Sequence, residues 1–473
     1  VLTTMDDETF ATESEPWVTV HNNRRRRNIA IAGILIVVAS VVALVLGVTL
    51  YDRGGISGDA TRDSGFGSGE TVFSPTAAPT RTPPTRAPTQ APTELSLLGL
   101  LQRESLGDGS ELLDSSTYQY QAMAWLETID HESLSDDAIL QKFALACIFY
   151  ATYEKRTLYT DAVYGYDAAP PGWNRTDNWL SQESECTWFG ILCNNNGKVN
   201  DIELYSNSLT GSFPPEVVYL NQSLKALDLY DNVIWNQGDP GHAWLEQMTS
   251  LQYLFYGNTF FQYDGIPTYI GALTNLIEYD CSTTLYFGDL RGEIFQNLQN
   301  LTYLVMGDNS YNMATVPSQI INLPKLQYLY MHNCDLQGNL AFMKNFTKMQ
   351  EFWIDKNLGI KGSIPSQIGQ LSDSLVTFSA TGCSLSGSIP SEIGLLTNMR
   401  KIWLSGNSIT GRVPTEIGLL KKLEVLEVYD NGLQGRMPIP VCNLVVPSTN
   451  GGNLTTLVAD CEVLNCTCCT SCK

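Results

Sequence analysis

The chain has 473 residues, of which 43% are hydrophobic, so it holds enough apolar material for a long core. Its 49 acidic residues outnumber its 28 basic ones and give a formal net charge of -21. Because so acidic a surface repels phosphate backbones, we expect no nucleic acid partner.

The amino end predicts a membrane anchor. Four arginines at 24–27 precede the stretch 29–51, which contains no charged residue. At 1.5 Å per residue, a helix of this length crosses a hydrocarbon core of roughly 30 Å. The alternative is a cleavable signal peptide, whose apolar core spans only about 7 to 15 residues. We therefore predict one transmembrane helix at 29–51.

The basic flank fixes the expected orientation. Basic residues stay in the cytosol, so 1–28 is predicted to be a cytosolic tail, too short for a catalytic domain. The carboxyl side then lies outside, as in a single-pass type II signal-anchor protein, and the plasma membrane is the expected location. Residues 52–93 are rich in Gly and Ser and then in Pro and Thr, which favours an extended stalk between membrane and folded domain.

Residues 94–198 predict a cap, and 94–154 within it reads as helical. Ser135, followed by Asp136 and Asp137, suits a helix start. Two stripes of apolar residues at helical spacing accompany it; they are Ile139, Phe143, Cys147 and Tyr150, and Tyr118, Ala122, Trp125 and Ile129. These stripes are expected to form a small core over the first of the repeats that follow.

Residues 199–438 repeat one phrase ten times with a period of about 25 residues. A clear copy, NMRKIWLSGNSITGRVPTEIGLL, occupies 398–420. The first positions of the copies, counted as offset 0, are Val199, Leu224, Leu251, Leu276, Leu301, Leu326, Met349, Leu375, Met399 and Leu423. The third and fourth copies depart most from the pattern.

Each copy predicts one short strand. Offsets 3 and 5, such as Ile402 and Leu404, alternate with polar or aromatic residues, which is the signature of a strand with one buried face. One copy alone cannot bury that face, so stacked copies are expected to form a long parallel sheet on the concave side of a curved solenoid.

Offset 8 carries a small polar residue in most copies. An amide there is expected to bond the backbone of the turn and the next coil, and a cysteine fits as a small residue with a weak S–H donor. The residues are Asn207, Asn232, Asn309, Asn357, Asn407 and Asn431, with Cys334, Cys383, Thr259 and Thr284 in the other copies.

The second half of the phrase resembles a known family. The pattern L-x-G-x-I-P at 385–390, 409–414 and 433–438, and the pattern C-x-W-x-G-x-x-C formed by Cys186, Trp188, Gly190 and Cys193, are similar to those of plant-type leucine-rich repeat surface proteins. The chain therefore resembles a receptor-like protein of this type without a kinase domain. The resemblance implies an α/β solenoid, a horseshoe of about ten repeats with a helical amino-terminal cap. It also implies a Cys186–Cys193 disulfide and an interaction scaffold.

Residues 439–473 predict a cysteine-rich cap. An oxidising compartment favours three disulfides there, although Cys469-x-x-Cys472 also has zinc-ligand spacing. The six cysteines are Cys442, Cys461, Cys466, Cys468, Cys469 and Cys472, and fifteen pairings are conceivable. Four others fall at predicted buried positions, where free thiols are common; they are Cys147, Cys281, Cys334 and Cys383.

Six N-glycosylation sequons follow the predicted span, on its outer side. They begin at Asn174, Asn221, Asn300, Asn345, Asn453 and Asn465.

Catalytic chemistry is not expected. His332, Asp355 and Thr381 share offset 6 in successive copies, but a nucleophile triad needs the histidine between acid and hydroxyl, and here the aspartate lies in the middle. We predict no enzyme, no cofactor and no resident metal.

The concave face is the predicted ligand site. Offsets 2, 4 and 6 are expected to face solvent and carry ten aromatic residues, Tyr205, Tyr230, Tyr253, Phe255, Tyr303, Tyr328, Tyr330, Trp353, Trp403 and Tyr429. Acidic residues lie between them, namely Asp201, Glu203, Asp228, Glu278, Asp280, Glu351, Asp355 and Glu427. The predicted contacts are Tyr328, Tyr330, His332, Trp353, Asp355, Trp403 and Tyr429. The alternative is that strand aromatics merely suit a sheet and pack laterally.

These features predict a membrane-anchored glycoprotein that binds an extracellular peptide, protein or glycan, as a receptor or co-receptor that signals through a partner. The alternative is a structural adhesion or cell-wall protein.

Overall fold

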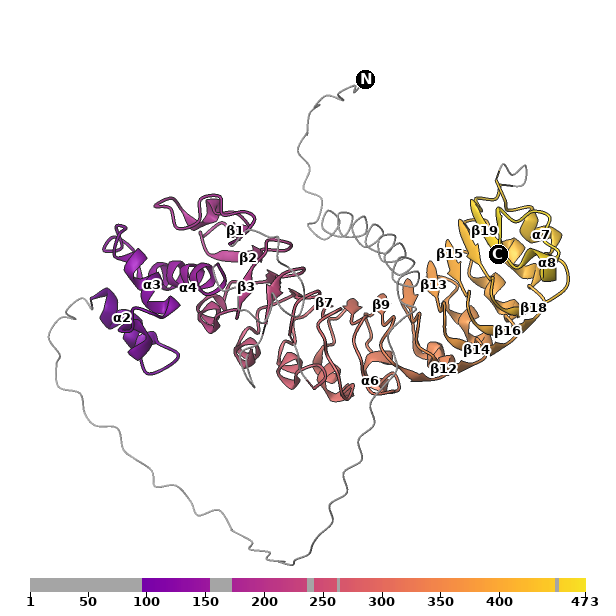
Figure 1. Ribbon diagram of the computed structural model, residues 1–473, viewed down its shortest axis with the longest axis horizontal. Coiled ribbons are helices and arrows are strands. Elements are labelled where there is room, and N and C mark those ends of the chain that lie inside the picture. The colour runs from indigo at the N-terminus through magenta and orange to yellow at the C-terminus, as the bar shows by residue number, and fades with distance from the viewer. Residues whose placement is uncertain (1–95, 154–171, 236–241, 262–263, 447–450) are drawn as a thin grey trace, which may run out of the picture. The chain divides into compact units, whose positions relative to one another are not determined.

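The computed structural model (Figure 1) describes residues 96–153, 172–235, 242–261, 264–446 and 451–473. All of them belong to one compact unit, Gln90–Lys473. The predicted tail, transmembrane helix and stalk at 1–93 lie outside the described residues. Within the described ranges, no helix combines the length and the apolar character that a bilayer crossing requires.

One long sheet, the main sheet, runs through the described unit. Its strand order is β1-β2-β4-β6-β7-β8-β9-β11-β13-β15-β17-β19-β20, and every neighbouring pair is parallel except β1 and β2. The strands are β1 Ile191–Cys193, β2 Val199–Glu203, β4 Ala226–Asp228, β6 Tyr253–Phe255, β7 Glu278–Asp280, β8 Tyr303–Val305, β9 Tyr328–Tyr330, β11 Glu351–Trp353, β13 Thr377–Ser379, β15 Lys401–Trp403, β17 Val425–Glu427, β19 Thr456–Ala459 and β20 Ser471–Cys472.

The ten predicted first positions agree with these strands. Val199 begins β2, and each later position lies two residues before a strand, in the irregular third and fourth copies as well. The prediction missed β19 and β20, which extend the sheet into the cysteine-rich segment.

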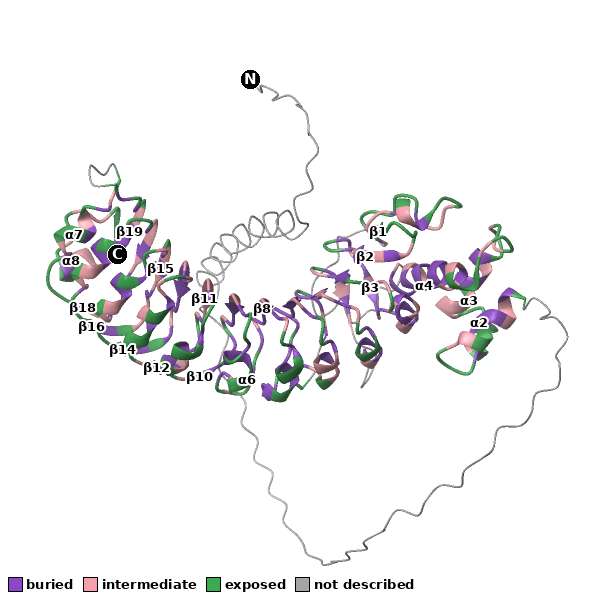
Figure 2. Cartoon of the chain, turned by 180° about the vertical axis from the view of Figure 1, so that it is seen from behind, coloured by how far each residue is buried: buried purple, intermediate pink, exposed green. Residues whose placement is uncertain are grey.

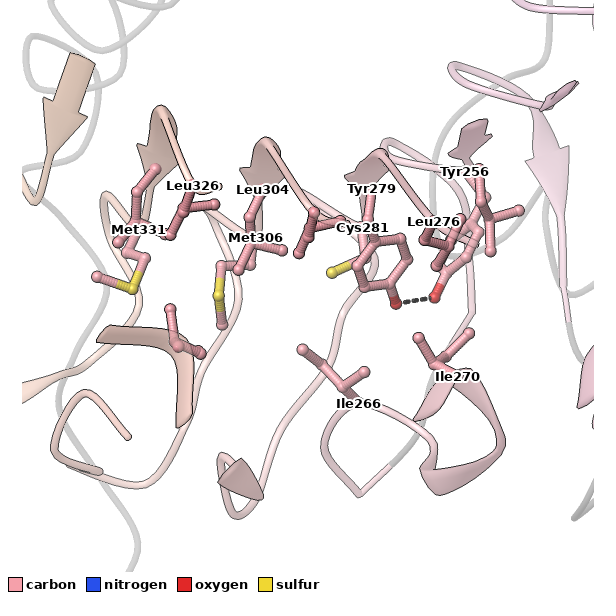
Figure 3. Packing of buried hydrophobic residues seen from close by; sticks show 14 of the residues in the cluster. Tyr256, Ile266, Ile270, Leu276, Tyr279, Cys281, Leu304, Met306, Leu326 and Met331 are labelled. Atoms are coloured by element: carbon pink, nitrogen blue, oxygen red, sulfur yellow. Dashed lines mark hydrogen bonds between the residues drawn. The ribbon is translucent and has the colours of Figure 1, made fainter. Parts of the chain in front are cut away.

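The core lies between the main sheet and a row of short helical turns, which lie across the core from the sheet. Ile402 and Leu404, at offsets 3 and 5, are fully buried, as predicted. Figure 3 shows the same layer in the third to sixth copies, where Leu304, Met306 and Met331 pack side by side from successive coils. The turns are η3 Pro215–Leu220, η4 Ala243–Gln247, η5 Thr268–Ala272, η6 Gly292–Asn297, α6 Ser318–Ile321, η7 Leu340–Asn345, η8 Ser366–Leu371, η9 Ser391–Leu395, η10 Thr415–Leu419, α7 Ile439–Cys442 and α8 Cys461–Leu464.

A second parallel sheet, here called the side sheet, was not predicted. It is made by the L-x-G part of the phrase and contains β10 Gln337–Gly338, β12 Gly359–Gly362, β14 Ser384–Gly387, β16 Ser408–Gly411 and β18 Gly432–Leu433. A smaller pair, β3 Thr210–Gly211 and β5 Val233–Ile234, pairs in parallel in the first two copies. Leu385 and Ile409 are buried while their neighbours in β14 and β16 are exposed, so the side sheet has one solvent face (Figure 2).

The asparagines at offset 8 join each coil to the one before it. The Asn357 carbonyl oxygen accepts from the backbone N–H groups of Cys334, at 3.0 Å, and Leu336, at 2.9 Å, and its amide nitrogen donates to Met331 O at 2.8 Å. It also donates to Ile354 O in its own coil. The prediction that the amide bonds the next coil was therefore wrong, because these backbone groups belong to the preceding coil.

Other residues at offset 8 replace only part of this bonding. The Cys334 thiol donates to Met306 O of the preceding coil at 3.0 Å, and the Cys383 thiol to Ile354 O at 3.3 Å. The Thr259 hydroxyl bonds Tyr256 O within its own coil. Near Thr259 the core is itself polar, since the hydroxyl of Tyr256 bonds that of Tyr279 (Figure 3) and also that of Tyr286.

Three helices form the amino-terminal cap: α2 Leu97–Glu104, α3 Tyr118–Leu126 and α4 Asp136–Thr152. Two one-turn segments, η1 Ser110–Leu112 and η2 Glu185–Thr187, accompany them. The Ser135 side chain caps α4 by accepting from Ala138 N, as predicted. The second predicted stripe is only partly helical, because α3 ends before Ile129.

A buried polar contact ties α4 to the cysteine-paired loop. Lys142 Nζ lies 2.5 Å from Glu185 Oε2, and Gln141 donates to Glu185 Oε1 at 2.6 Å. Gln141 also accepts from Val199 N at the start of β2. Removing one partner of such a buried pair is costly, so this contact fixes the cap on the first strand.

Disulfides close both ends of the described unit. Cys186 is joined to Cys193, and the carboxyl end holds Cys442–Cys468, Cys461–Cys472 and Cys466–Cys469. Because Cys469 and Cys472 belong to different disulfides, the zinc interpretation of their spacing was wrong. The four remaining cysteines, Cys147, Cys281, Cys334 and Cys383, are buried free thiols, as predicted.

We predict that Asn357→Ala lowers the free energy of unfolding by about 3 kcal/mol, because it leaves buried N–H and C=O groups of two coils without hydrogen-bond partners. Chemical denaturation of the variant and the parent measures this. The control is Asn275→Ala, which removes one exposed bond to Thr249 O and is expected to cost under about 1 kcal/mol. Equal losses in the two variants would contradict the role given to the asparagine.

Candidate ligand-binding face

The side of the main sheet opposite the core carries offsets 2, 4 and 6 of every copy, and we call it the main-sheet face. Parallel pairing sets equivalent residues of neighbouring copies beside one another; Tyr330, for example, lies between Val305 and Trp353. Neighbouring strands are about 4.8 Å apart, so large side chains on this face reach those of the next copy. The face is therefore a set of columns of side chains that run across the strands.

Five aromatic rings form a continuous row on this face, here called the aromatic row; they are Tyr303, Tyr328, Tyr330, Trp353 and Trp403. The Tyr303 ring centroid lies 5.7 Å from that of Tyr328 and 5.6 Å from that of Tyr330. Tyr330 and Trp353 are 5.7 Å apart, and Trp353 and Trp403 are 5.4 Å apart. The last pair meets across Ser379, a small residue of the intervening strand β13.

The prediction that all ten aromatic residues face solvent was wrong. Phe255, Tyr303 and Tyr330 are buried, with 1%, 7% and 8% of their surface exposed. Tyr205 is exposed, and the remaining six are half-buried. Lateral packing between strands accounts for the buried rings of the aromatic row, because rings of this size exceed the spacing of the strands. Tyr330 thus supports the row, whereas Tyr328, Trp353, Trp403 and Tyr429 offer partly open surface.

Polar partners orient the row. The Tyr328 hydroxyl donates to Gln350 Oε1 and the Tyr330 hydroxyl to Glu351 Oε2, both at 2.8 Å. Trp353 Nε1 is buried and has no hydrogen-bond partner in the described part of the chain. Lysines lie over the rings toward the carboxyl end, with Lys401 Nζ 5.7 Å from the Trp403 centroid and Lys473 Nζ 5.6 Å from that of Tyr429.

His332 and Asp355 are neighbours without forming a triad. His332 Nε2 lies 3.2 Å from Asp308 Oδ2 on the preceding copy, and the imidazole lies over Gly307, where any Cβ would collide with it. Asp355 Oδ1 instead accepts from Ser379 Oγ and Thr381 N, both at 2.6 Å. His332 therefore does not lie between Asp355 and a hydroxyl, and these described residues do not form a nucleophile triad.

The two aspartates near His332 have opposite shifts in pKa. Burial raises the pKa of Asp355, and the hydrogen bonds from Ser379 and Thr381 only partly oppose it. Burial also acts on Asp308, but there the hydrogen bond and charge of His332 outweigh it, and its pKa is lowered. Sequence reasoning missed Asp308, because it lies at offset 7, to which the repeat pattern gave no role on the face.

Several predicted acidic residues are less open than expected. Asp201, Asp228, Glu278 and Asp280 are buried, whereas Glu203, Glu351, Asp355 and Glu427 are half-buried. Asp280 Oδ1 accepts from Ser282 N and Ser282 Oγ, and Asp228 Oδ1 accepts from Tyr230 N. These two aspartates therefore also order their own turns.

The predicted glycosylation asparagines differ in access. Asn174, Asn345, Asn453 and Asn465 are exposed, while Asn221 and Asn300 are half-buried. The Asn300 side chain is held by two contacts, donating to Thr274 O at 3.2 Å and accepting from Lys325 Nζ at 2.7 Å. The exposed four are the better candidates for modification, which stays a prediction.

Comparison with known proteins agrees with this architecture. The family model of the leucine-rich repeat matches residues 398–420. Receptor-like protein kinase 7 of Arabidopsis thaliana is 32% identical over 167 residues, which are 35% of this chain and 17% of that protein. Receptor-like protein kinase HAIKU2 of the same plant is 28% identical over 170 residues, which are 34% of this chain and 17% of that protein.

Two solved structures from Arabidopsis thaliana share the fold. One is the LRR ectodomain of the plant membrane receptor kinase GASSHO1/SCHENGEN3 in complex with CASPARIAN STRIP INTEGRITY FACTOR 2, with a TM-score of 0.51, 24% identity, and coverage of 66% of this chain and 34% of that one. The other is the receptor kinase HAESA in complex with the peptide hormone IDA and the co-receptor SERK1, with a TM-score of 0.53, 22% identity, and coverage of 69% and 53%.

The repeats are thus leucine-rich repeats, and the chain is similar to plant receptor-like proteins that carry them. It spans about a sixth of the length of the curated relatives it matches.

The raised pKa of Asp355 gives a prediction for pH. The folded state favours the protonated carboxyl of Asp355 over the ionised form. The stability that the protonated form contributes is fully present below the unfolded pKa of about 3.9 and is lost as pH rises through the folded pKa. Asp355→Asn keeps an acceptor for Ser379 and Thr381, so its unfolding free energy is expected to fall less as pH rises from about 4.

Denaturation of parent and variant at a series of pH values measures this effect. The exposed Asp373→Asn serves as the control for losing one carboxylate. If both variants followed the same pH curve, the assignment of the effect to Asp355 would be wrong.

Proposed function

We propose that this chain is a receptor-like or co-receptor protein that binds an extracellular peptide or protein along its main-sheet face. The observation that carries the proposal is the aromatic row, which runs across neighbouring copies on one face and includes partly open rings at Tyr328, Trp353 and Trp403. Tyr429, also half-buried, lies on the same face one copy further on. Aromatic rings of this kind are the usual anchors of protein recognition.

The surroundings of the row suit a polar chain laid along it. Half-buried carboxylates at Glu351 and Glu427 lie beside the rings, as acceptors for backbone N–H groups or basic side chains of a ligand. Burial raises the pKa of Glu427, opposed by the hydrogen bond from Trp403 and the charge of Lys473, and a cationic ligand group beside it would favour the ionised carboxylate. The 32% identity with a receptor-like kinase over 167 residues supports the receptor part of the proposal.

The amino end of the sequence supports a proposal for how the protein is placed in the membrane. The uncharged stretch 29–51 anchors the chain in the plasma membrane, the basic flank 24–27 keeps 1–28 in the cytosol, and 52–93 carries the repeats outside as a glycosylated domain. In this arrangement the repeats contribute recognition rather than catalysis, and signalling passes through a partner protein.

We predict that Trp353→Ala combined with Trp403→Ala weakens ligand binding by about 2 kcal/mol, roughly thirtyfold in Kd. The 473-residue chain in detergent is used to capture peptides and proteins from extracellular fluid, and binding of each captured species is then titrated against parent and variant. Both tryptophans are half-buried, so the variant is expected to stay folded, which its thermal unfolding checks.

The matched control is Phe287→Ala, which removes an exposed ring away from the main-sheet face. It is expected to bind like the parent. Capture that is absent, or that is equal in the double variant and the control, would contradict the proposed site and favour the adhesion alternative.

A further inference from the structure

Charge is segregated between the two sheets. In the ten copies, offsets 2, 4 and 6 of the main-sheet face hold eight acidic residues against one lysine, Lys401. The side-sheet strands, each taken to one residue past the glycine of its coil, hold no acidic residue, at 337–339, 359–363, 384–388, 408–412 and 432–436. Three cations, Lys361, Arg412 and Arg436, lie there instead. In a chain of net charge -21, these side-sheet segments thus carry basic residues and no acidic ones.

The side sheet offers this surface as an open, flat array. Lys361, Arg412 and Arg436 are all exposed, and each has a glycine on one side and a buried apolar residue on the other, which is Ile360, Val413 or Met437. A glycine with positive φ, a conformation that other residues adopt only with strain, ends each of the first four strands and lies two residues beyond the end of β18. These glycines are Gly338, Gly362, Gly387, Gly411 and Gly435.

The glycines keep the surface shallow. Since they lack side chains, the residue that follows the glycine of one coil lies against the glycine of the next. A Cβ at Gly435 would lie 3.6 Å from Arg412 Cγ, and one at Gly411 would lie 3.4 Å from Ser388 Cβ. Arg412 therefore extends over Gly435 toward the next coil, which carries Arg436.

The three cations are available to a partner. In the described ranges, none of them takes part in an ion pair. The exposed neutral residues around them carry hydroxyl or amide groups, as in Ser386, Ser388 and Gln434. The Thr410 hydroxyl is already used, donating to Gly387 O at 3.3 Å.

This chemistry distinguishes between classes of partner. The outward positions within these strands contain no aromatic or large aliphatic side chain, and the one large apolar side chain exposed directly before them is Leu358, so the strands themselves lack the apolar anchors on which protein interfaces depend. Arginine binds sulfate and carboxylate through paired N–H donors, and hydroxyl and amide groups match the hydroxyls of sugars. We propose that the side sheet binds a polyanionic polysaccharide, bearing sulfate or carboxylate groups, laid across its strands.

This site is separate from the proposed ligand site, since it belongs to another sheet and uses opposite charge. A receptor-like chain with both surfaces would contact an anionic extracellular matrix through the side sheet while its main-sheet face stays open to a ligand.

The test uses Arg412→Ser with Arg436→Ser in the 473-residue chain in detergent. Serine is the natural residue at the equivalent positions Ser363 and Ser388, so the surface keeps its shape. Binding to dextran sulfate and to polygalacturonate is measured over a range of salt concentrations. The parent is expected to bind at least one of them with an affinity that falls with salt, and the double variant to bind it about tenfold more weakly.

The control is Lys225→Ser with Lys348→Ser, which removes two exposed positive charges outside the side sheet. It is expected to bind like the parent, and neutral dextran is expected not to bind. No binding to either polyanion, or equal weakening in the two double variants, would overturn the proposal. Binding of duplex DNA as tight as that of the polysaccharide would overturn the polysaccharide assignment.

If the double variant does not fold, a second variant tests the same surface. Lys361→Gln places at 361 the residue found at the equivalent positions Gln337 and Gln434, and it alone is expected to weaken polyanion binding several-fold. Unchanged binding in this folded variant would count against the site.

Discussion

The hydrogen bonds of the offset-8 asparagines are the constraint on which the rest of the structure depends. Each copy contributes a strand of only a few residues, which no isolated coil could keep in register. A buried amide such as that of Asn357 holds its own turn and also the N–H groups of Cys334 and Leu336 in the coil before it. Because the bond recurs along the chain, at Asn232, Asn309 and Asn407 among others, each coil that carries such an asparagine is fixed against its predecessor.

This stacking creates surfaces whose chemistry no single copy contains. Tyr330, Trp353 and Trp403 are separated in sequence by about one and two copies, yet their rings form one row. The same stacking sets Lys361, Arg412 and Arg436 on the side sheet, away from the carboxylates of the main-sheet face. The two ends of the stack are closed by different means, a buried Lys142–Glu185 contact with one disulfide at the start and three disulfides at the finish.

The strands of the ten copies could be predicted from the sequence, because burial of offsets 3 and 5 leaves a period that survives irregular copies such as the third. The direction of the asparagine bonds could not, since the pattern shows that a turn needs an amide but not which neighbouring coil supplies its partners. The side sheet was missed because two to four residues are too few for alternation to be visible, and Leu385 or Ile409 alone looks like part of a loop.

The candidate site was predicted in position but not in exposure. The columns of the face follow from the period, so Tyr328, Tyr330 and Trp353 were expected close together, and the structure does bring them together. Whether a ring is open depends on residues one copy away, and the burial of Tyr303 and Tyr330 arises from lateral contacts between copies. The shared offset predicted His332 and Asp355 as neighbours but gave no sign of the contact between His332 and Asp308, which forms because the imidazole lies back over Gly307.

The most direct measurement of the central claim, that the main-sheet face binds an extracellular ligand, can be made before the ligand is identified. A photoreactive phenylalanine analogue is placed at Trp403 in one chain and, in another, at Leu395, which is 54% exposed in the turn η9 away from the face. After illumination in extracellular fluid, the account predicts a discrete cross-linked product at position 403 and none at 395. Products at both positions, or at 395 alone, would contradict it.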